Sequence, residues 1–272
     1  MSHKKKRRRQ HDEGGRVDGP PAPVLVHVDG QIVVVDKPAG LTTMRHASEA
    51  AEFGARARRF LPVTLADLLP RMLLNHAGKP PPNRPGFRPA LPEVRAVHRI
   101  DKETSGLVVF ARTPAAARHL GNQFRGHTTE RRYLALVRGQ AKAGRIASSI
   151  ARDRGDGRRG SSDQPGGERA VTHVRVVEEL GEFTLVECRL ETGRTHQVRI
   201  HLGEAGTPLC GERIYDRPLH GRPVPDTSRA TRPLLHAALL GVEHPATGKK
   251  MQWEADLPAD MADLLKRLRK QS

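Results

Sequence analysis

The sequence predicts an α+β fold of mostly antiparallel strands with interspersed helices. Two observations carry this prediction. Pairs of β-branched or alternating runs are separated by short turns, as in antiparallel hairpins. Between these pairs lie segments whose apolar residues recur at helical spacing. The length of 272 residues suffices for one large domain or two small ones with a sizeable core.

The chain is expected to begin with a disordered basic tail, residues 1–20, ahead of one domain over residues 21–272. Residues 4–9 are all lysine or arginine, and the polar residues after them offer nothing to bury. Two interpretations of the tail stay open. It is either an arm that binds RNA phosphates without a fold of its own, or a solvated terminus.

The N-terminal half is expected to hold a hairpin, a helix and a loop. The turn Asp29-Gly30 separates the β-branched runs 24–28 and 32–35, which is a good hairpin signal. Leucines recur at helical spacing over about 64–74. The span 78–92 is rich in Pro, Arg and Gly, so it predicts a loop without packed structure.

A buried strand and a capped helix are expected next. Residues 107–111 are apolar throughout. Thr113 followed by Pro114 combines a capping hydroxyl with proline at the first helical position. The helix that they begin places its apolar side chains on one face. These side chains are Ala117, Leu120 and Phe124.

The C-terminal half predicts further strands and two helices. The expected strands are 131–139, the antiparallel pair 171–177 and 183–190, and the hairpin 234–242 with 251–255. Thr195 is expected to cap a helix that ends near Ala205 and faces the core with Val198, Leu202 and Ala205. Pro258 opens a final helix. Its apolar stripe is Met261, Leu264, Leu265 and Leu268. Residues 151–169 predict a mobile basic loop.

The composition points to a polyanionic partner. The net charge is +17 and the pI about 10.9, which favours nucleic acid over the alternative of a generally basic surface. Aromatic residues make up 3% of the chain, so RNA contacts are expected to rely on Arg and Lys rather than on many stacked bases.

The compartment predicted is the cytoplasm. Cys188 and Cys210 are too few for a disulfide scaffold in a chain of this length, and they lack the spacing of a metal site. No apolar run is long enough to span a bilayer, and the basic N-terminus lacks the apolar segment of a secretory signal. No membrane contact is therefore expected.

Asp101 is the strongest candidate for a reactive group. It lies in the polar segment 98–107, directly before the apolar run that forms the buried strand. Taken singly, such an aspartate is more often a turn or cap residue. A reactive carboxylate in a dry pocket also needs a fixed cation, and Arg199 suits that role. Tyr133 could stack on a base, and Arg99 could replace an extruded base, but spacing alone establishes none of these pairings.

Neither a metal nor a cofactor is expected. His196 and His201 are five residues apart, and the basic residues around them would repel a cation. His119 and His127 fall on an expected surface helix and loop. The chain also lacks a nucleophile elbow, a phosphate-binding glycine loop and a dinucleotide fingerprint.

Several segments resemble, in order, the motifs of the RluA-type pseudouridine synthases. The resemblance covers about residues 24–258, and no S4-type RNA-binding domain is recognisable before it. Small departures are Ile100 for the usual Leu, Arg131 or Arg132 for Lys, and Glu212 for Asp. The matching segments are 36–41 (Asp-Lys-Pro-Ala-Gly-Leu), 98–107 (His-Arg-Ile-Asp-Lys-Glu-Thr-Ser-Gly-Leu), 132–139, 190–202, 208–212, 235–237 and 244–245.

The resemblance implies the pseudouridine synthase catalytic fold, a central mostly antiparallel mixed sheet flanked by helices. It implies isomerisation of uridine in structured RNA, either ribosomal (large-subunit), transfer or both, by a monomer. Asp101 would be the nucleophile and Arg199 its ion-pair partner. Tyr133 would stack on the uracil and could take up the C5 proton.

The other implied site residues fall into two groups. Three are expected to contact RNA, and for Lys37 a structural role is equally open: Arg99, Lys37 and Arg194. Six are expected to support the site, as loop-holding or neighbouring groups: His98, Thr104, Ser105, Gly106, His196 and Gln197. Stretches 45–97 and 151–169 are expected to determine which RNA is recognised.

Two other functions are compatible with the composition. A non-catalytic RNA-binding or ribosome-assembly factor could keep the same fold, but the joint presence of Asp101, Tyr133 and Arg199 favours an enzyme. A basic DNA-binding protein is disfavoured because no helix-turn-helix or zinc-finger pattern is present.

Overall fold

The structure, a computed structural model, describes residues 21–45, 61–78, 90–155, 157–163 and 165–271. Its strands are β1 (Val24–Val28), β2 (Ile32–Lys37), β3 (Arg95–Ala96), β4 (Ser105–Ala111), β5 (Glu130–Arg138), β6 (Gly144–Ala151), β7 (Gly160–Ser161), β8 (Glu168–Leu180), β9 (Phe183–Leu190), β10 (Leu235–Glu243) and β11 (Lys250–Glu254). Its helices are α3 (Leu65–His76), α4 (Pro114–Arg125), α5 (Gln197–Glu204) and α6 (Ala259–Leu268).

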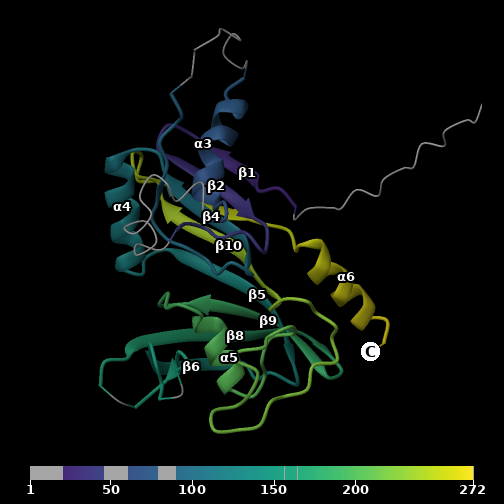
Figure 1. The fold of residues 1–272 in the computed structure, drawn as a ribbon. Helices are drawn as coiled ribbons and strands as arrows, with labels where there is room; N and C mark the ends of the chain where they lie inside the picture. The colour runs from purple at the N-terminus through teal and green to yellow at the C-terminus, as the bar shows by residue number, and fades with distance from the viewer. Residues whose placement is uncertain (1–20, 46–60, 79–89, 156, 164, 272) are drawn as a thin grey trace, which may run out of the picture.

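All these strands join one mixed sheet. The order is β1-β2-β4-β10-β5-β9-β8-β6-β7, with β3 beside β4 and β11 beside β10. Among the strand pairs of the described residues, only β4 with β10 is parallel. Figure 1 shows β1, β2, β4 and β10 in one half with α3 and α4, and β5, β9, β8 and β6 in the other half with α5. The predicted α+β fold with a mostly antiparallel mixed sheet is therefore confirmed.

Helices cover both faces of the first half of the sheet. Side chains alternate between the two faces of a strand, so neighbouring residues of β2 meet different helices. Val33 and Val35 pack in the cluster that contains Leu65 and Leu69 of α3. Ile32 and Val34 instead pack in the cluster that contains Ala116 and Leu120 of α4.

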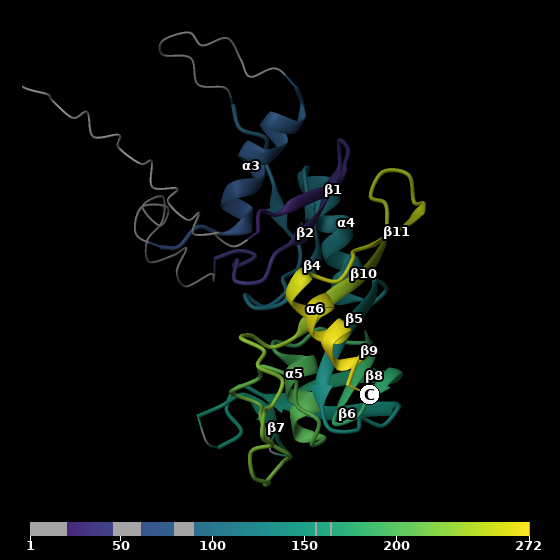
Figure 2. The same ribbon diagram turned by 90° about the vertical axis from the view of Figure 1, so that its right-hand side faces the viewer.

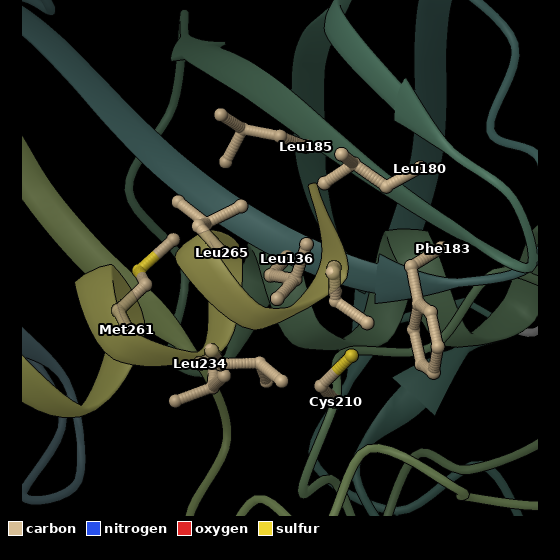
Figure 3. Packing of buried hydrophobic residues seen from close by; sticks show 10 residues of the cluster. Leu136, Leu180, Phe183, Leu185, Cys210, Leu234, Met261 and Leu265 are labelled. Carbon is tan, nitrogen blue, oxygen red and sulfur yellow. The ribbon is translucent and has the colours of Figure 1, made fainter. Parts of the chain in front are cut away.

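The second half is covered in the same way. Val198 and Leu202 of α5 pack against Ala135 and Val137 of β5. The opposite face of β5 carries Leu136, which packs with the apolar stripe of α6 and with residues of β8 and β9 (Figure 3). Figure 2 shows α6 lying alongside β5 and β9. The predicted final helix and its stripe are confirmed, since all four stripe residues are buried.

Most other predicted elements are also confirmed. The first hairpin pairs as β1 with β2, residues 171–177 and 183–190 pair within β8 and β9, and residues 234–255 form β10 and β11. Thr113 caps α4 by accepting a hydrogen bond from the backbone N–H of Ala116. Thr64 caps α3 through a reciprocal pair of bonds with Asp67.

The helix predicted from Thr195 to Ala205 needs a correction. The residue that precedes α5 is His196, in the left-handed conformation with φ of 59°, and no side chain caps the helix. Ala205 is exposed, so it does not face the core as predicted. A threonine hydroxyl is a good local signal for a cap, but it cannot show that the chain turns one residue later.

The predicted loops are only partly described. The span 151–169 contains the short strand β7 and the ends of β6 and β8, and β6 itself was not predicted. Most of 78–92 and the whole of the predicted tail 1–20 lie outside the described residues. In the part of the chain that the structure describes, no helix is long and apolar enough to cross a membrane.

Candidate active site

The loop that carries Asp101 is tied down through its backbone. Thr104 donates its N–H to the carbonyl oxygen of Asp101 at 3.1 Å, and the Thr43 hydroxyl donates to the carbonyl of Ile100 at 2.9 Å. Arg232, from much later in the sequence, donates to the carbonyl of Glu103 at 3.0 Å. The loop is therefore held at several points before the chain enters β4, and the Asp101 side chain is left to face a pocket.

Lys37 belongs to these anchors, which supports the structural one of its two predicted roles over the RNA contact. Its side chain is fully buried, and Nζ donates to the carbonyl oxygens of Pro38, Leu41 and Lys102 at 2.8 to 3.1 Å. Burial lowers the pKa of Lys37 to about 7, although the charges of Glu103 and Asp101 oppose the shift. The residue joins the end of β2 to the Asp101 loop and offers no group to a ligand.

The sheet register brings Tyr133 to this loop. Ala237 of β10 pairs with Gly106 of β4 on one side and with Tyr133 of β5 on the other. Tyr133 is therefore two strand spacings, roughly 10 Å, from the start of β4. Burial raises the pKa of Tyr133, the charge of Asp101 adds to this shift, and Arg131 opposes it.

Helix α5 supplies two groups to Asp101. Nη1 of Arg199 lies 3.6 Å from one carboxylate oxygen of Asp101, and Nε2 of His196 lies 3.9 Å from the other. The left-handed backbone of His196 places its ring at the start of α5, where Nδ1 is hydrogen-bonded to the Tyr215 hydroxyl at 2.8 Å. Burial lowers the pKa of His196.

Glu212 holds Arg199 and was not among the predicted site residues. Nε and Nη2 of Arg199 donate to the two carboxylate oxygens of Glu212 at 2.7 and 3.0 Å. Three consecutive backbone N–H groups, from Arg213, Ile214 and Tyr215, also donate to this buried carboxylate. The pKa of Glu212 is lowered, because these bonds outweigh the effect of burial. The signal available in the sequence was its place in the matching segment 208–212, where Glu212 stands for the usual Asp.

Among the predicted supporting residues, His98 joins the Asp101 loop to β4 and α4. Its Nε2 accepts the backbone N–H of Val109 at 3.0 Å, and its ring stacks on Phe124 with the centroids 4.2 Å apart. Burial lowers the pKa of His98 to about 3. The ring is therefore neutral and fixed, as a structural group requires.

Ser105 and Gly106 join β4 to β10. The Ser105 hydroxyl and Nδ1 of His236 share a hydrogen bond of 3.0 Å. A Cβ on Gly106 would overlap the backbone of Ala237, and φ of Gly106 is +108°. Only glycine lets the two strands approach so closely.

Gln197 shapes the segment that leads into α5. It is buried and accepts hydrogen bonds from the Thr192 hydroxyl at 2.7 Å and from the backbone N–H of Arg194 at 3.0 Å. Its amide nitrogen donates to the carbonyl of Val171 at 2.9 Å and to Thr172. Gln197 thus fixes residues 192–194 against β8.

The remaining predicted RNA contacts lie at the same pocket. Arg99 is exposed beside Asp101, and Arg194 is half-buried, with its guanidinium paired with Glu168. Both line a cavity of about 420 Å³, together with Asp101, Tyr133 and Arg199. A cavity of this size suits a nucleotide-sized ligand. The three predicted catalytic side chains, which come from distant parts of the chain, therefore share one cavity.

Comparisons with known proteins agree on one family. The family model described as RNA pseudouridylate synthase matches residues 31–204. An uncharacterized RNA pseudouridine synthase of Bacillus subtilis (strain 168) is 38% identical over 248 residues, 90% of this chain and 73% of the relative. The ribosomal large subunit pseudouridine synthase D of Zymomonas mobilis is 38% identical over 247 residues, 90% of this chain and 72% of the relative.

A solved structure shares the fold. Human RNA pseudouridylate synthase domain containing 4 superimposes with a TM-score of 0.66 at 24% identity, over 90% of this chain and 93% of that one. At this identity the likeness concerns the fold alone, and it fits the mixed sheet and the two helix-covered faces described above.

Proposed function

The chain belongs to the RNA pseudouridylate synthase family, and on this premise we propose that Asp101 is the nucleophile with which it isomerises uridines of large-subunit ribosomal RNA. The family and the named relatives make the chain an RNA pseudouridine synthase. The reaction breaks the bond between N1 of uracil and C1′ of ribose and forms a bond between C5 and C1′. The proton leaves C5 and N1 gains one, so the product is an isomer and no cofactor is consumed.

The observation that carries the assignment is the contact between Asp101 and Arg199. The 3.6 Å separation places the Arg199 cation beside the Asp101 carboxylate in the cavity. The Asp101 side chain keeps 19% of its surface exposed, whereas the Glu212 side chain on the same arginine is fully buried. Of the two carboxylates, Asp101 is the one that a substrate can reach.

Tyr133 and Arg99 receive the base in this proposal. Tyr133 projects into the cavity from β5 and provides a flat ring on which the uracil stacks. Its raised pKa keeps the phenol protonated at neutral pH, so removal of the C5 proton needs help from water. Arg99 at the rim fills the space that the extruded base leaves, which offsets part of an unstacking cost on the order of a few kcal/mol.

The target follows from the relatives and is also a proposal. Relatives at 36 to 38% identity are described as ribosomal large subunit pseudouridine synthase D, so large-subunit ribosomal RNA is the first substrate to test and transfer RNA the second. We further propose that residues 21–272 act as a monomeric catalytic domain in the cytoplasm.

Replacing Asp101 with asparagine tests the nucleophile. The Asp101→Asn variant is expected to retain RNA binding and to release no tritium from C5-labelled uridine in total RNA. The matched control is Arg118→Gln, at an exposed position of α4 that does not line the cavity. Wild-type tritium release by Asp101→Asn would refute the assignment.

Mapping pseudouridine identifies the substrate. Ribosomal and transfer RNA from cells with and without this protein are compared position by position. We expect at least one pseudouridine in large-subunit ribosomal RNA to disappear when the protein is absent. Loss confined to transfer RNA would contradict the proposed target.

Activity is also expected to survive EDTA. A strict requirement for a metal would contradict the expectation that no cofactor is needed.

A further inference from the structure

Arg131 contributes a buried guanidinium to the catalytic cavity, and two of its nitrogens lack a hydrogen-bond partner among the described residues. It lies on β5 and is 8% exposed. Its Nε and Nη2 atoms are fully buried, and neither has a hydrogen-bond partner among the described residues. Burying a charged donor without an acceptor destabilises the folded protein. A position with this cost calls for an acceptor that arrives with the substrate.

The two unpartnered nitrogens select the chemistry of that acceptor. Nε–H and Nη2–H form the side edge of the guanidinium and point in parallel, so they match two oxygens of one oxyanion. Arg199 in the same cavity already uses this edge, with Nε and Nη2 on the two oxygens of Glu212. Uracil does not fit, because its two carbonyl oxygens are separated by an N–H donor. In RNA, the oxyanion that offers two such oxygens is a phosphodiester.

The charge around Arg131 favours the same ligand. Arg125, which also lines the cavity, donates to the neutral Asn122 side chain at 2.5 Å rather than to a carboxylate. Burial lowers the pKa of the neighbouring His127, and the positive charges of Arg131 and Arg194 lower it further. Positive charge is therefore in excess around Arg131. Arg199, in the same cavity, instead lies between the carboxylates of Asp101 and Glu212.

The packing places Arg131 beside the base site. Residues two apart on a strand share a face, so Arg131 and Tyr133 project to the same side about 7 Å apart along β5. The guanidinium lies over the ring of Phe124, with Cζ 5.9 Å from the centroid. On another side it meets the backbone of Gly193, where a Cβ would come within 2.5 Å of Nη1.

We propose that Arg131 binds a phosphodiester group adjoining the extruded uridine and thereby positions the nucleotide over Tyr133. The proposal rests on the pseudouridine synthase function proposed above. Because Nε and Nη2 are enclosed, the entering RNA has to move a neighbouring group to reach them.

Neutral phosphate analogues test the contact directly. The probe is a hairpin cut from the cellular RNA around the uridine mapped above, with one methylphosphonate at a time on the phosphates that flank it. For the wild type, one of these substitutions is expected to lower kcat/KM about tenfold, as loss of a charged hydrogen bond does. We expect Arg131→Gln to lower kcat/KM on the all-phosphate hairpin about tenfold. In this variant the same methylphosphonate is expected to lower kcat/KM no further. Equal losses for both proteins at every position would overturn the proposal.

Two variants separate phosphate binding from a structural effect. Arg131→Lys keeps the charge without the parallel pair of donors, so it is expected to recover part of the activity and of the methylphosphonate effect. Arg118→Gln, outside the cavity, is expected to match the wild type. If Arg131→Gln does not fold, Arg131→Lys carries the test, because a methylphosphonate effect of wild-type size in that variant also contradicts the bidentate contact.

A binding measurement keeps this test independent of catalysis. In the Asp101→Asn background, Arg131→Gln is expected to reduce the salt dependence of hairpin binding by about 0.7 in the slope of log K against log salt, one phosphate contact on a single strand. An unchanged slope would overturn the phosphate contact. Full activity of Asp101→Asn would instead refute the nucleophile and leave this slope as the test of Arg131.

Discussion

At the scale of single residues, Arg199 lies between two carboxylates and contacts them with different geometry. Glu212 receives the parallel pair of donors at 2.7 and 3.0 Å and is fully buried. Asp101 receives the remaining nitrogen at 3.6 Å and stays partly exposed. A carboxylate with only long contacts, 3.6 Å to Arg199 and 3.9 Å to His196, can move to a ribose carbon or a base, whereas one held by five donors cannot.

Neutralising Glu212 is expected to damage both folding and catalysis. Glu212→Gln leaves Arg199 buried with a single charged neighbour, and breaking a buried ion pair costs roughly 3–5 kcal/mol. Urea unfolding at pH 7 measures the loss, and tritium release measures the activity. The matched control is Glu178→Gln, whose partner Arg269 lies at the surface and which is expected to cost far less. Equal costs for the two variants would contradict the buried pair.

The neutral ring of His98 predicts a loss of stability in acid. Its folded pKa of about 3 lies below the ordinary 6.5, so between these values only the unfolded chain binds a proton there. Stability is then complete above pH 6.5 and falls as the pH drops toward 3. Between pH 7 and pH 5 this group alone is expected to cost about 2 kcal/mol.

The His98→Gln variant isolates this contribution. Glutamine can still accept the Val109 N–H, but it does not titrate. Urea unfolding of both proteins at pH 7 and pH 5 is expected to show the smaller loss in the variant. Parallel curves would mean that the imidazole is protonated in the folded state.

At the scale of elements, the parallel contact between β4 and β10 positions the reaction. It extends over the pairs Ser105 with His236 and Gly106 with Ala237, after which β4 continues beside β2. The loop before β4 therefore opens directly over β10 and β5. Asp101 from this loop and Tyr133 from β5 line the same cavity because only β10 separates their strands.

Gly106→Ala is expected to disrupt that contact. The added Cβ overlaps backbone atoms of Ala237, and a φ of +108° is a strained conformation for alanine. We expect a loss of at least about 3 kcal/mol in the free energy of unfolding, since both strands have to shift. Gly144→Ala is the control, because nothing lies within 4 Å of its Cβ position. A Gly106→Ala protein as stable as this control would contradict the close approach.

At the scale of the whole molecule, we expect the net charge of +17 to be the main source of RNA affinity. Binding of the mapped hairpin to Asp101→Asn is expected to weaken linearly in log K against log salt. With about 6–10 phosphate contacts at about 0.7 each, the affinity falls roughly 300- to 16,000-fold between 50 and 200 mM salt. Fluorescence anisotropy measures it. A slope near zero would mean that base contacts dominate, against the composition.

Much of the architecture could be predicted from local patterns. The stripe of α6, the Thr113-Pro114 start of α4 and the Asp29-Gly30 hairpin each depend on residues a few positions apart, and all were predicted. Thr195 was one exception, because the turn before α5 depends on the left-handed His196. That conformation is stabilised by the fold around it, through Asp101 and Tyr215.

The sequence by itself determined the family, through motifs that contain Asp101, Tyr133 and Arg199. Only the tertiary structure decided which groups surround them. Three features depend on contacts between elements far apart in the chain. They are the burial of Lys37, the pair of hydrogen bonds from Arg199 to Glu212, and the two nitrogens of Arg131 that lack a hydrogen-bond partner among the described residues. Local periodicity encodes the direction of a side chain from its own strand or helix. Its partner is set by the order in which the strands join the sheet.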